Sequence, residues 1–125
     1  LIATKDELEF RENDIAYLQN QNEPFCGKEQ EFYESGKIME ETHFDRGKAR
    51  YYTAWFEDGE KQEEIYLKEG ERHGSYTYWN ENGQKREEGI FKEGKANGIC
   101  IMYDEKGRNM LETFWRDDKE VFDSP

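Results

Sequence analysis

The sequence has few basic residues for its length, no long apolar run and only two cysteines. Its 125 residues contain 18 Lys and Arg against 30 Asp and Glu, which gives a formal net charge of −12. A chain that binds nucleic-acid phosphates or an anionic membrane surface needs clustered basic side chains, so we expect neither kind of partner. No apolar stretch approaches the roughly 20 residues of a membrane-spanning helix. Two cysteines are too few to decide the redox compartment.

The sequence also lacks the motifs of common catalytic and metal sites. It contains no Cys-x-x-Cys, no His-Glu-x-x-His, no calcium-loop spacing and no glycine-rich phosphate loop before a helix. Paired glutamates such as Glu63 and Glu64 recur, but successive strand residues point to opposite faces, so a pair does not converge on one substrate. His73 lies beside a turn glycine, where a surface position is expected. We therefore expect a protein that is not an enzyme and has no catalytic, cofactor or metal site.

What the chain does contain is a repeat with a nearly fixed period. Four turn glycines are separated by 23, 24 and 24 residues: Gly36, Gly59, Gly83 and Gly107. A glutamate series and a bulky series keep the same steps: Glu41, Glu64, Glu88 and Glu112, and Phe44, Leu67, Phe91 and Trp115. A period between about 20 and 50 residues is typical of stacked structural units. The 15% aromatic content argues against disorder, so the chain is predicted to be a folded repeat array.

Each period reads as a β-hairpin. Residues 75–79 are aromatic, small or β-branched, and residues 80–83 form a turn that ends in Asn-Gly. Residues 85–91 read as the return strand and residues 92–94 as a second turn, which leaves no room for a helix. We therefore predict an all-β fold: a single elongated, twisted sheet of about ten sequential antiparallel strands, with any helix only near the N-terminus.

The repeat divides the chain into two parts of one domain. Residues 1–24 match the repeat only loosely and are predicted to be a lead with a capping half-repeat, in which Tyr17 and Leu18 cover the open sheet edge. Residues 25–125 are predicted to hold the hairpin repeats. Cys26 and Cys100 would then lie about six strands apart, too far for a disulfide between them.

Aromatic residues before the first turn of each unit define the candidate surface. Counting along the units groups Phe32, Trp55 and Tyr78 in one column, with Met102 in the last unit. The next column contains Tyr33, Phe56, Trp79 and Tyr103. Adjacent strand residues point to opposite faces, so we expect the two columns on opposite sides of the sheet. We predict that Phe32, Trp55 and Tyr78 bind a partner and that the other column is packed.

The repeated units resemble a known family. An aromatic residue followed by a turn ending in Gly recurs at residues 33–37, 56–60, 79–84 and 103–108, and an aromatic or bulky residue with a second turn recurs at 44–48, 67–71, 91–95 and 115–119. This pattern resembles MORN-type repeats, in the variant found in bacterial YwqK-family antitoxin proteins. The resemblance implies a linear hairpin array and a role as the neutralising partner of a toxin.

Taken together, these features predict a binding protein. We expect a repeat-protein interaction module, with the antitoxin role as its specific form, whose negative surface attracts a basic protein. Two alternatives stay open: a structural or cell-envelope-associated repeat protein, and a small-ligand or glycan binder that uses exposed aromatic side chains. An antitoxin is expected in the cytoplasm. Removal of a signal peptide before Leu1 would instead indicate the periplasm or the envelope.

Overall fold

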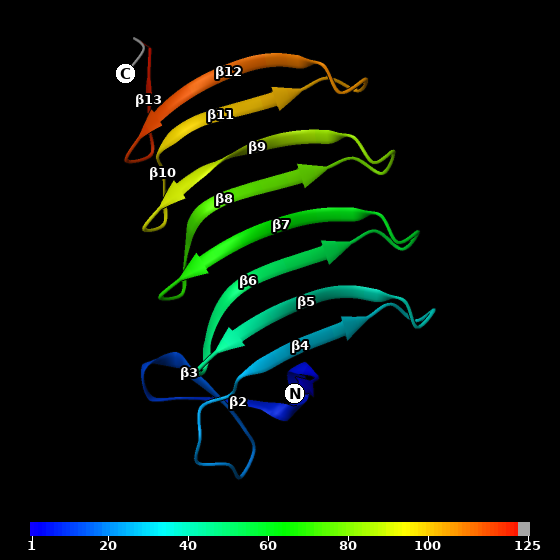
Figure 1. Ribbon diagram of the computed structural model, residues 1–125, viewed down its shortest axis with the longest axis vertical. Helices are drawn as coiled ribbons and strands as arrows, with labels where there is room; N and C mark the ends of the chain where they lie inside the picture. The colour runs from blue at the N-terminus through cyan, green and yellow to red at the C-terminus, as the bar shows by residue number, and fades with distance from the viewer. Residues whose placement is uncertain (123–125) are drawn as a thin grey trace.

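One long β-sheet dominates the computed structural model of the chain, which describes residues 1–122 (Figure 1). Eleven strands form this sheet in the order β1-β4-β5-β6-β7-β8-β9-β11-β12-β13, with the short β10 paired to β9. In chain order the elements are β1 (Ile2–Ala3), η1 (Lys5–Glu7), β2 (Leu8–Arg11), η2 (Glu12–Asp14), β3 (Ile15–Leu18), β4 (Gly27–Phe32), β5 (Ile38–Asp45), β6 (Lys48–Trp55), β7 (Lys61–Lys68), β8 (Glu71–Trp79), β9 (Lys85–Lys92), β10 (Lys95–Ala96), β11 (Gly98–Tyr103), β12 (Asn109–Arg116) and β13 (Lys119–Val121). The predicted all-β array of sequential hairpins is confirmed, and the 3-10 helices of the described residues lie near the N-terminus.

The hairpins use two kinds of turn, one along each side of the array (Figure 1). In the longer turns a residue after the first strand pairs with a residue four positions later, as in Tyr33 N–H to Lys37 O at 2.8 Å. The same bond recurs from Phe56, Asn80 and Asp104, at 2.8, 2.9 and 2.8 Å. The tight turns have two residues with positive φ, for example Glu69 at 50° and Gly70 at 78°. This geometry matches the twist of the flanking strands and explains the glycine at the second position.

A β-bulge follows each of the longer turns. In the hairpin of β6 and β7, Ala54 pairs with Glu63 and Trp55 pairs with Lys61, so Gln62 is the extra residue. Equivalent register shifts occur in the hairpins of β4–β5, β8–β9 and β11–β12. An extra residue changes the alternation of side chains between the two faces. Residues three apart across the bulge therefore face the same side of the sheet.

The N-terminal residues add a second layer at one end of the sheet. Strands β2 and β3 form a separate two-stranded sheet that lies beside the first tight turn. Backbone bonds join the two parts: Ala16 N–H donates to Gly47 O at 2.8 Å, and Phe25 N–H donates to Ala16 O at 2.8 Å. Between the layers is the main hydrophobic cluster, formed by Ala3, Leu8, Ala16, Phe25 and Phe44.

The prediction that Tyr17 and Leu18 cover the open edge of the sheet is wrong. Tyr17 and Leu18 lie in β3, where they pair with β2 and not with the long sheet. Ile2 and Ala3 of β1 instead pair with β4, in parallel. The residues before Phe25 do not repeat the hairpin pattern, so their strand pairing could not be read from the period.

The two cysteines lie at distant places in the sheet. Cys26 directly precedes β4, whereas Cys100 lies in β11, six strands further along the sheet order. Both are free thiols. Their predicted separation is confirmed by this topology.

Candidate functional site

The strand register places the repeated glutamates in two rows on opposite faces of the sheet. One row of directly paired positions contains Glu31, Glu40, Ala54, Glu63, Tyr78, Glu87 and Met102. The adjacent row contains Gln30, Glu41, Thr53, Glu64, Thr77, Glu88 and Ile101. Neighbouring rows face opposite sides of a sheet. We call the side of the first row the acidic face and the side of the second row the ion-paired face.

On the ion-paired face, each glutamate of the row contacts a side chain of the same chain. Glu41 contacts His43 at 2.8 Å, Glu64 forms an ion pair with Lys61, and Lys85 lies 2.9 Å from Glu88. The Tyr103 hydroxyl also donates to Glu88 at 2.5 Å. These bonds, from Tyr103 first and then Lys85, lower the pKa of Glu88. The charges of this face are therefore largely balanced by neighbouring side chains.

Sequence reasoning missed these ion pairs, although a signal was present. Lys61 precedes Glu64 by three residues and Lys85 precedes Glu88 by three, at the same place in two repeats. Residues three apart in a regular strand point to opposite faces. The bulge at Gln62 or Arg86 brings each pair to one side, and that bulge is not visible in the spacing alone.

On the acidic face, the carboxylates have no such cations. Of the ion pairs among residues 1–122, none includes the five glutamates of this face, which are Glu29, Glu31, Glu40, Glu63 and Glu87. Two of them accept hydrogen bonds from tyrosines instead: Tyr52 donates to Glu40 and Tyr76 donates to Glu87, both at 2.6 Å. Burial, followed by the charges of Glu31 and Glu40, raises the pKa of Glu29. The five carboxylates of the acidic face are therefore not neutralised by ion pairs among the described residues.

Aromatic side chains and two arginines, Arg72 and Arg86, occupy the same face beside this row. The rings of Tyr76 and Phe91 lie 5.3 Å apart, and those of Tyr76 and Tyr78 lie 5.1 Å apart. The Arg72 guanidinium stacks 4.4 Å from the Phe91 ring centre and donates to the Tyr78 hydroxyl. Burial raises the pKa of Tyr76, and its bonds with Cys100 and Glu87 add to this. Tyr52 and Tyr76 are therefore neutral hydrogen-bond donors to Glu40 and Glu87.

The predicted partner-binding set is divided between the two faces. Phe32 and Trp55 lie on the ion-paired face, with Phe32 half exposed at 50%. Tyr78 lies on the acidic face, opposite Glu63 and Glu87. The expectation that Phe32, Trp55 and Tyr78 form one surface is therefore wrong.

The error is a slip of one residue between the second and third repeats. Counted back from the turn glycine, Trp55 precedes Gly59 by four residues, and the residue four before Gly83 is Trp79, not Tyr78. The turn bonds confirm this alignment, since Phe56 and Asn80 make the same hydrogen bond. A slip of one residue in a strand moves every side chain to the other face. The co-facial column is Phe32, Trp55, Trp79 and Tyr103.

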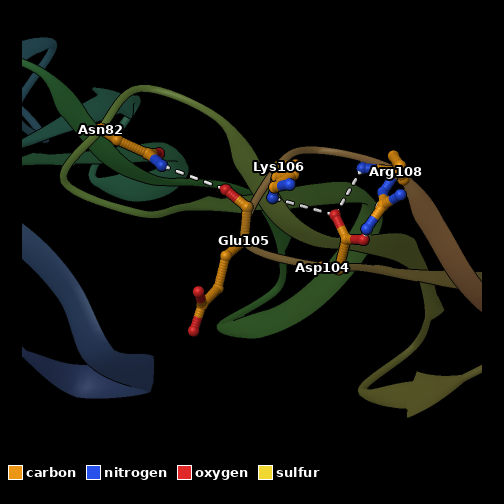
Figure 2. A network of polar contacts seen from close by, with 5 residues as sticks. All are labelled: Asn82, Asp104, Glu105, Lys106 and Arg108. Atoms are coloured by element: carbon orange, nitrogen blue, oxygen red, sulfur yellow. Dashed lines mark hydrogen bonds and ion pairs between the residues drawn. The ribbon is translucent and has the colours of Figure 1, made fainter.

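A hydrogen bond joins two successive longer turns, and further polar contacts lie within the second of them (Figure 2). Asn82 Nδ2 donates to Glu105 O of the next turn at 3.2 Å. Within that turn Asp104 accepts from the backbone of Lys106 and Arg108, both at 2.9 Å, and from Arg108 Nε at 2.7 Å. The backbone bond from Arg108 is the main reason that the pKa of Asp104 is lowered. The Asp104 carboxylate therefore serves the structure of the turn.

Three further features of the described residues concern metal binding, membrane spanning and cavities. Within residues 1–122, no group of three or more His, Cys, Asp and Glu side chains is placed to hold a metal ion. In the same residues no helix has the length and apolar character required to cross a bilayer. A hollow of about 300 Å³ lies between the β2–β3 hairpin and two tight turns, lined by Phe10, Phe44, Lys48 and Ala49 among others.

Comparison with known families identifies the repeat. The family described as a MORN repeat variant matches residues 25–46 and residues 72–93. The chain carries this MORN repeat at two places. The matched segments contain the hairpins β4–β5 and β8–β9, and the intervening hairpin β6–β7 has the same turn bonds. No curated protein matches the chain. MORN repeats indicate a repeat-protein binding module, which agrees with the extended sheet.

Proposed function

We propose that the chain is a non-enzymatic binding module whose acidic face docks a basic protein. The observation that carries this proposal is the difference between the two faces. Glu64 and Glu88 of the ion-paired face are matched by Lys61 and Lys85, and Glu41 contacts the His43 ring, whereas the glutamates of the acidic face have no cation within ion-pair distance among residues 1–122. Cations supplied by a partner would balance this charge.

The half-buried state of the acidic-face carboxylates strengthens the argument. Glu29, Glu40 and Glu63 are each partly buried around Tyr52. Charges that are partly removed from water and lie near like charges are unfavourable, as the raised pKa of Glu29 indicates. Binding of lysine or arginine side chains would relieve this repulsion. The net charge of −12 would also speed the encounter with a basic protein.

Apolar side chains on the same face would add contact area. Met102 and Leu111 continue the glutamate row toward the C-terminal end and are 42% and 52% exposed. Tyr78 lies within the row, between Glu63 and Glu87. Interfaces commonly combine a desolvated apolar or aromatic centre with charged surroundings. Of the three residues predicted from sequence, Tyr78 belongs to this proposed surface.

The identity of the basic partner is a narrower proposal. Resemblance to YwqK-family antitoxins, added to the acidic face, favours a basic toxin that this chain neutralises. The acidic face supports a basic partner of any biological role, whereas the toxin rests on the resemblance.

Two charge-matched triple variants test the proposed function. Glu40→Gln/Glu63→Gln/Glu87→Gln alters the acidic face, and Glu41→Gln/Glu64→Gln/Glu88→Gln alters the ion-paired face. Each change moves the net charge by three, from −12 to −9. Binding to the folded basic proteins cytochrome c and lysozyme is measured by interferometry. We expect the first variant to bind at least about tenfold more weakly than the second. Equal weakening by both variants, or no binding by the unaltered chain, would contradict the proposal.

A further inference from the structure

The acidic-face glutamates recur at a regular distance across the strands. Glu40, Glu63 and Glu87 lie on β5, β7 and β9, and the row of paired positions places each two strands from the next. With about 4.8 Å between neighbouring strands, their spacing is about 9.6 Å. Equivalent strands of successive repeats run in nearly the same direction (Figure 1), so the three side chains project to a similar side.

This spacing selects among peptide conformations. A polyproline II helix has three residues per turn and rises about 3.1 Å per residue, so every third side chain recurs on one side at about 9.3 Å. In an extended β-strand, side chains on one side recur at about 6.6 Å or 13 Å, and neither distance fits. An α-helix offers about 10.5 Å between residues seven apart, so two such steps span about 21 Å and exceed two intervals of the glutamate row, about 19 Å, by about 2 Å.

The residues between the glutamates fit the same occupant. Tyr78 lies between Glu63 and Glu87, and Ala54 lies between Glu40 and Glu63. The neighbouring row of the face contains the half-buried Tyr52 and Ile65, and Tyr76, which is buried. Proline-rich segments in the polyproline II conformation dock on surfaces lined by aromatic rings. The acidic face thus alternates carboxylates with aromatic and apolar positions along the line that such a segment would follow.

We propose that the acidic face binds an extended polyproline II segment of its partner, with a lysine or arginine at every third residue. The segment crosses the strands at right angles, its basic side chains contact Glu40, Glu63 and Glu87, and its intervening residues contact Tyr52 and Tyr78. This inference rests on the proposed function and specifies the chemistry of the partner.

Synthetic peptides with matched composition test the spacing. One probe has four Lys-Pro-Pro units, and the other has the same twelve residues arranged as two Lys-Lys-Pro-Pro-Pro-Pro units. Fluorescence anisotropy at low ionic strength gives both dissociation constants. We expect the periodic peptide to bind about fivefold or more tightly than the clustered one. Glu63→Gln should remove this preference and Glu64→Gln should retain it, with circular dichroism confirming that both variants keep the β-spectrum.

The possible results separate the two proposals. Equal affinity for both peptides overturns the spacing argument but leaves a basic partner in place. Binding of cytochrome c or lysozyme without binding of either peptide shows that the partner surface is folded, and it also overturns this inference. Tighter binding of a helical peptide with lysines seven residues apart would show that the bound segment is a helix, and it would overturn the polyproline II proposal. Failure of peptides and folded basic proteins together contradicts the proposed function itself.

Discussion

The N-terminal end of the molecule is built in two layers, whereas the hairpins from β7 onward form a single layer. Five side chains are buried between the N-terminal layers: Ala3, Leu8, Ala16, Phe25 and Phe44. From β7 to the end of the described residues, Tyr76 is the one side chain buried to the same degree. The single layer is held by contacts between neighbours on one face, such as Tyr76 with Phe91 at 5.3 Å. Both faces of this part are left available to a partner.

Two equivalent residues of the repeat show what the second layer adds. Phe44 and Phe91 occupy the same position in their hairpins. The Phe44 ring lies 5.7 Å from Phe25 and 6.3 Å from Phe10, both supplied by the N-terminal residues. Phe91 has Tyr76 and Arg72 beside it and nothing from a second layer. The same repeat position is therefore core at one end and partly exposed surface at the other.

The largest expected effect tests this difference directly. Phe44→Ala should lower the free energy of unfolding by about 3–5 kcal/mol, because it leaves a cavity between two layers. Phe91→Ala removes contacts on one face only and should lower it by about 1–2 kcal/mol. Urea unfolding followed by tryptophan fluorescence measures both values. Equal losses would show that the second layer does not concentrate stability at the N-terminus.

The hairpin array could be predicted from the sequence because each unit carries its own turn signals. The glycines at the two turns fix the ends of the strands, and the period fixes the order in which the strands pair. Thus Gly59 and Gly70 were sufficient to define the hairpin of β6 and β7. The faces could not be assigned in the same way, because the step changes from 23 to 24 residues and the strand period is two. A count that differs by one residue places Tyr78 in the wrong column.

The N-terminal layer and the ion pairs needed contacts that no repeat encodes. Leu8 and Ala16 have no equivalents in the other units, so nothing in the period indicated that they cover Phe44. The pairing of Lys61 with Glu64 depends on the bulge at Gln62. The candidate site is the row of glutamates without ion pairs. It can be recognised only by comparison with the partners of the opposite row.

A second comparison uses two glycines with nearly the same backbone conformation. Gly47 has φ 80° and Gly70 has φ 78°, each in a tight turn. A Cβ at Gly47 would lie 2.3 Å from Ile15 Cγ2 and 2.9 Å from Ala16 O, whereas a Cβ at Gly70 meets nothing within 4 Å. Gly70→Ala should cost about 1–2 kcal/mol from backbone strain alone. Gly47→Ala should cost about 1–3 kcal/mol more, because the N-terminal layer must move.

Thermal unfolding of the two glycine variants gives the difference. A second readout is amide hydrogen exchange at Ala16, whose N–H donates to Gly47 O and should lose protection only in Gly47→Ala. If both variants lose equal stability, the β2–β3 hairpin does not pack closely enough on the first tight turn to oppose a Cβ at residue 47.

The smallest expected effect, less than about 1 kcal/mol for each residue, concerns two glutamates in the two regions. Glu29 lies in β4, next to the N-terminal layer, and burial is the first cause of its raised pKa. Glu88 lies in β9 of the single layer, where the Tyr103 and Lys85 bonds lower its pKa. The ionised form of Glu29 is disfavoured by folding and that of Glu88 is favoured. The two residues should therefore affect the pH dependence of stability with opposite signs.

The signs follow from the pKa of an unperturbed glutamate, 4.5. Because the pKa of folded Glu88 lies below this value, its stabilisation is present above pH 4.5 and is lost as the pH falls through the folded pKa. Glu88→Gln should thus be less stable than the unaltered chain at pH 7, and the difference should vanish in acid. Glu29→Gln should be more stable at pH 7, with the gain lost as the pH falls through the raised pKa toward 4.5. Urea unfolding midpoints between pH 3 and pH 7 measure both differences, and Glu34→Gln in an exposed turn serves as the control with little expected change. Two differences of the same sign would show that the burial of Glu29 and the bonds of Glu88 do not act on stability in opposite directions.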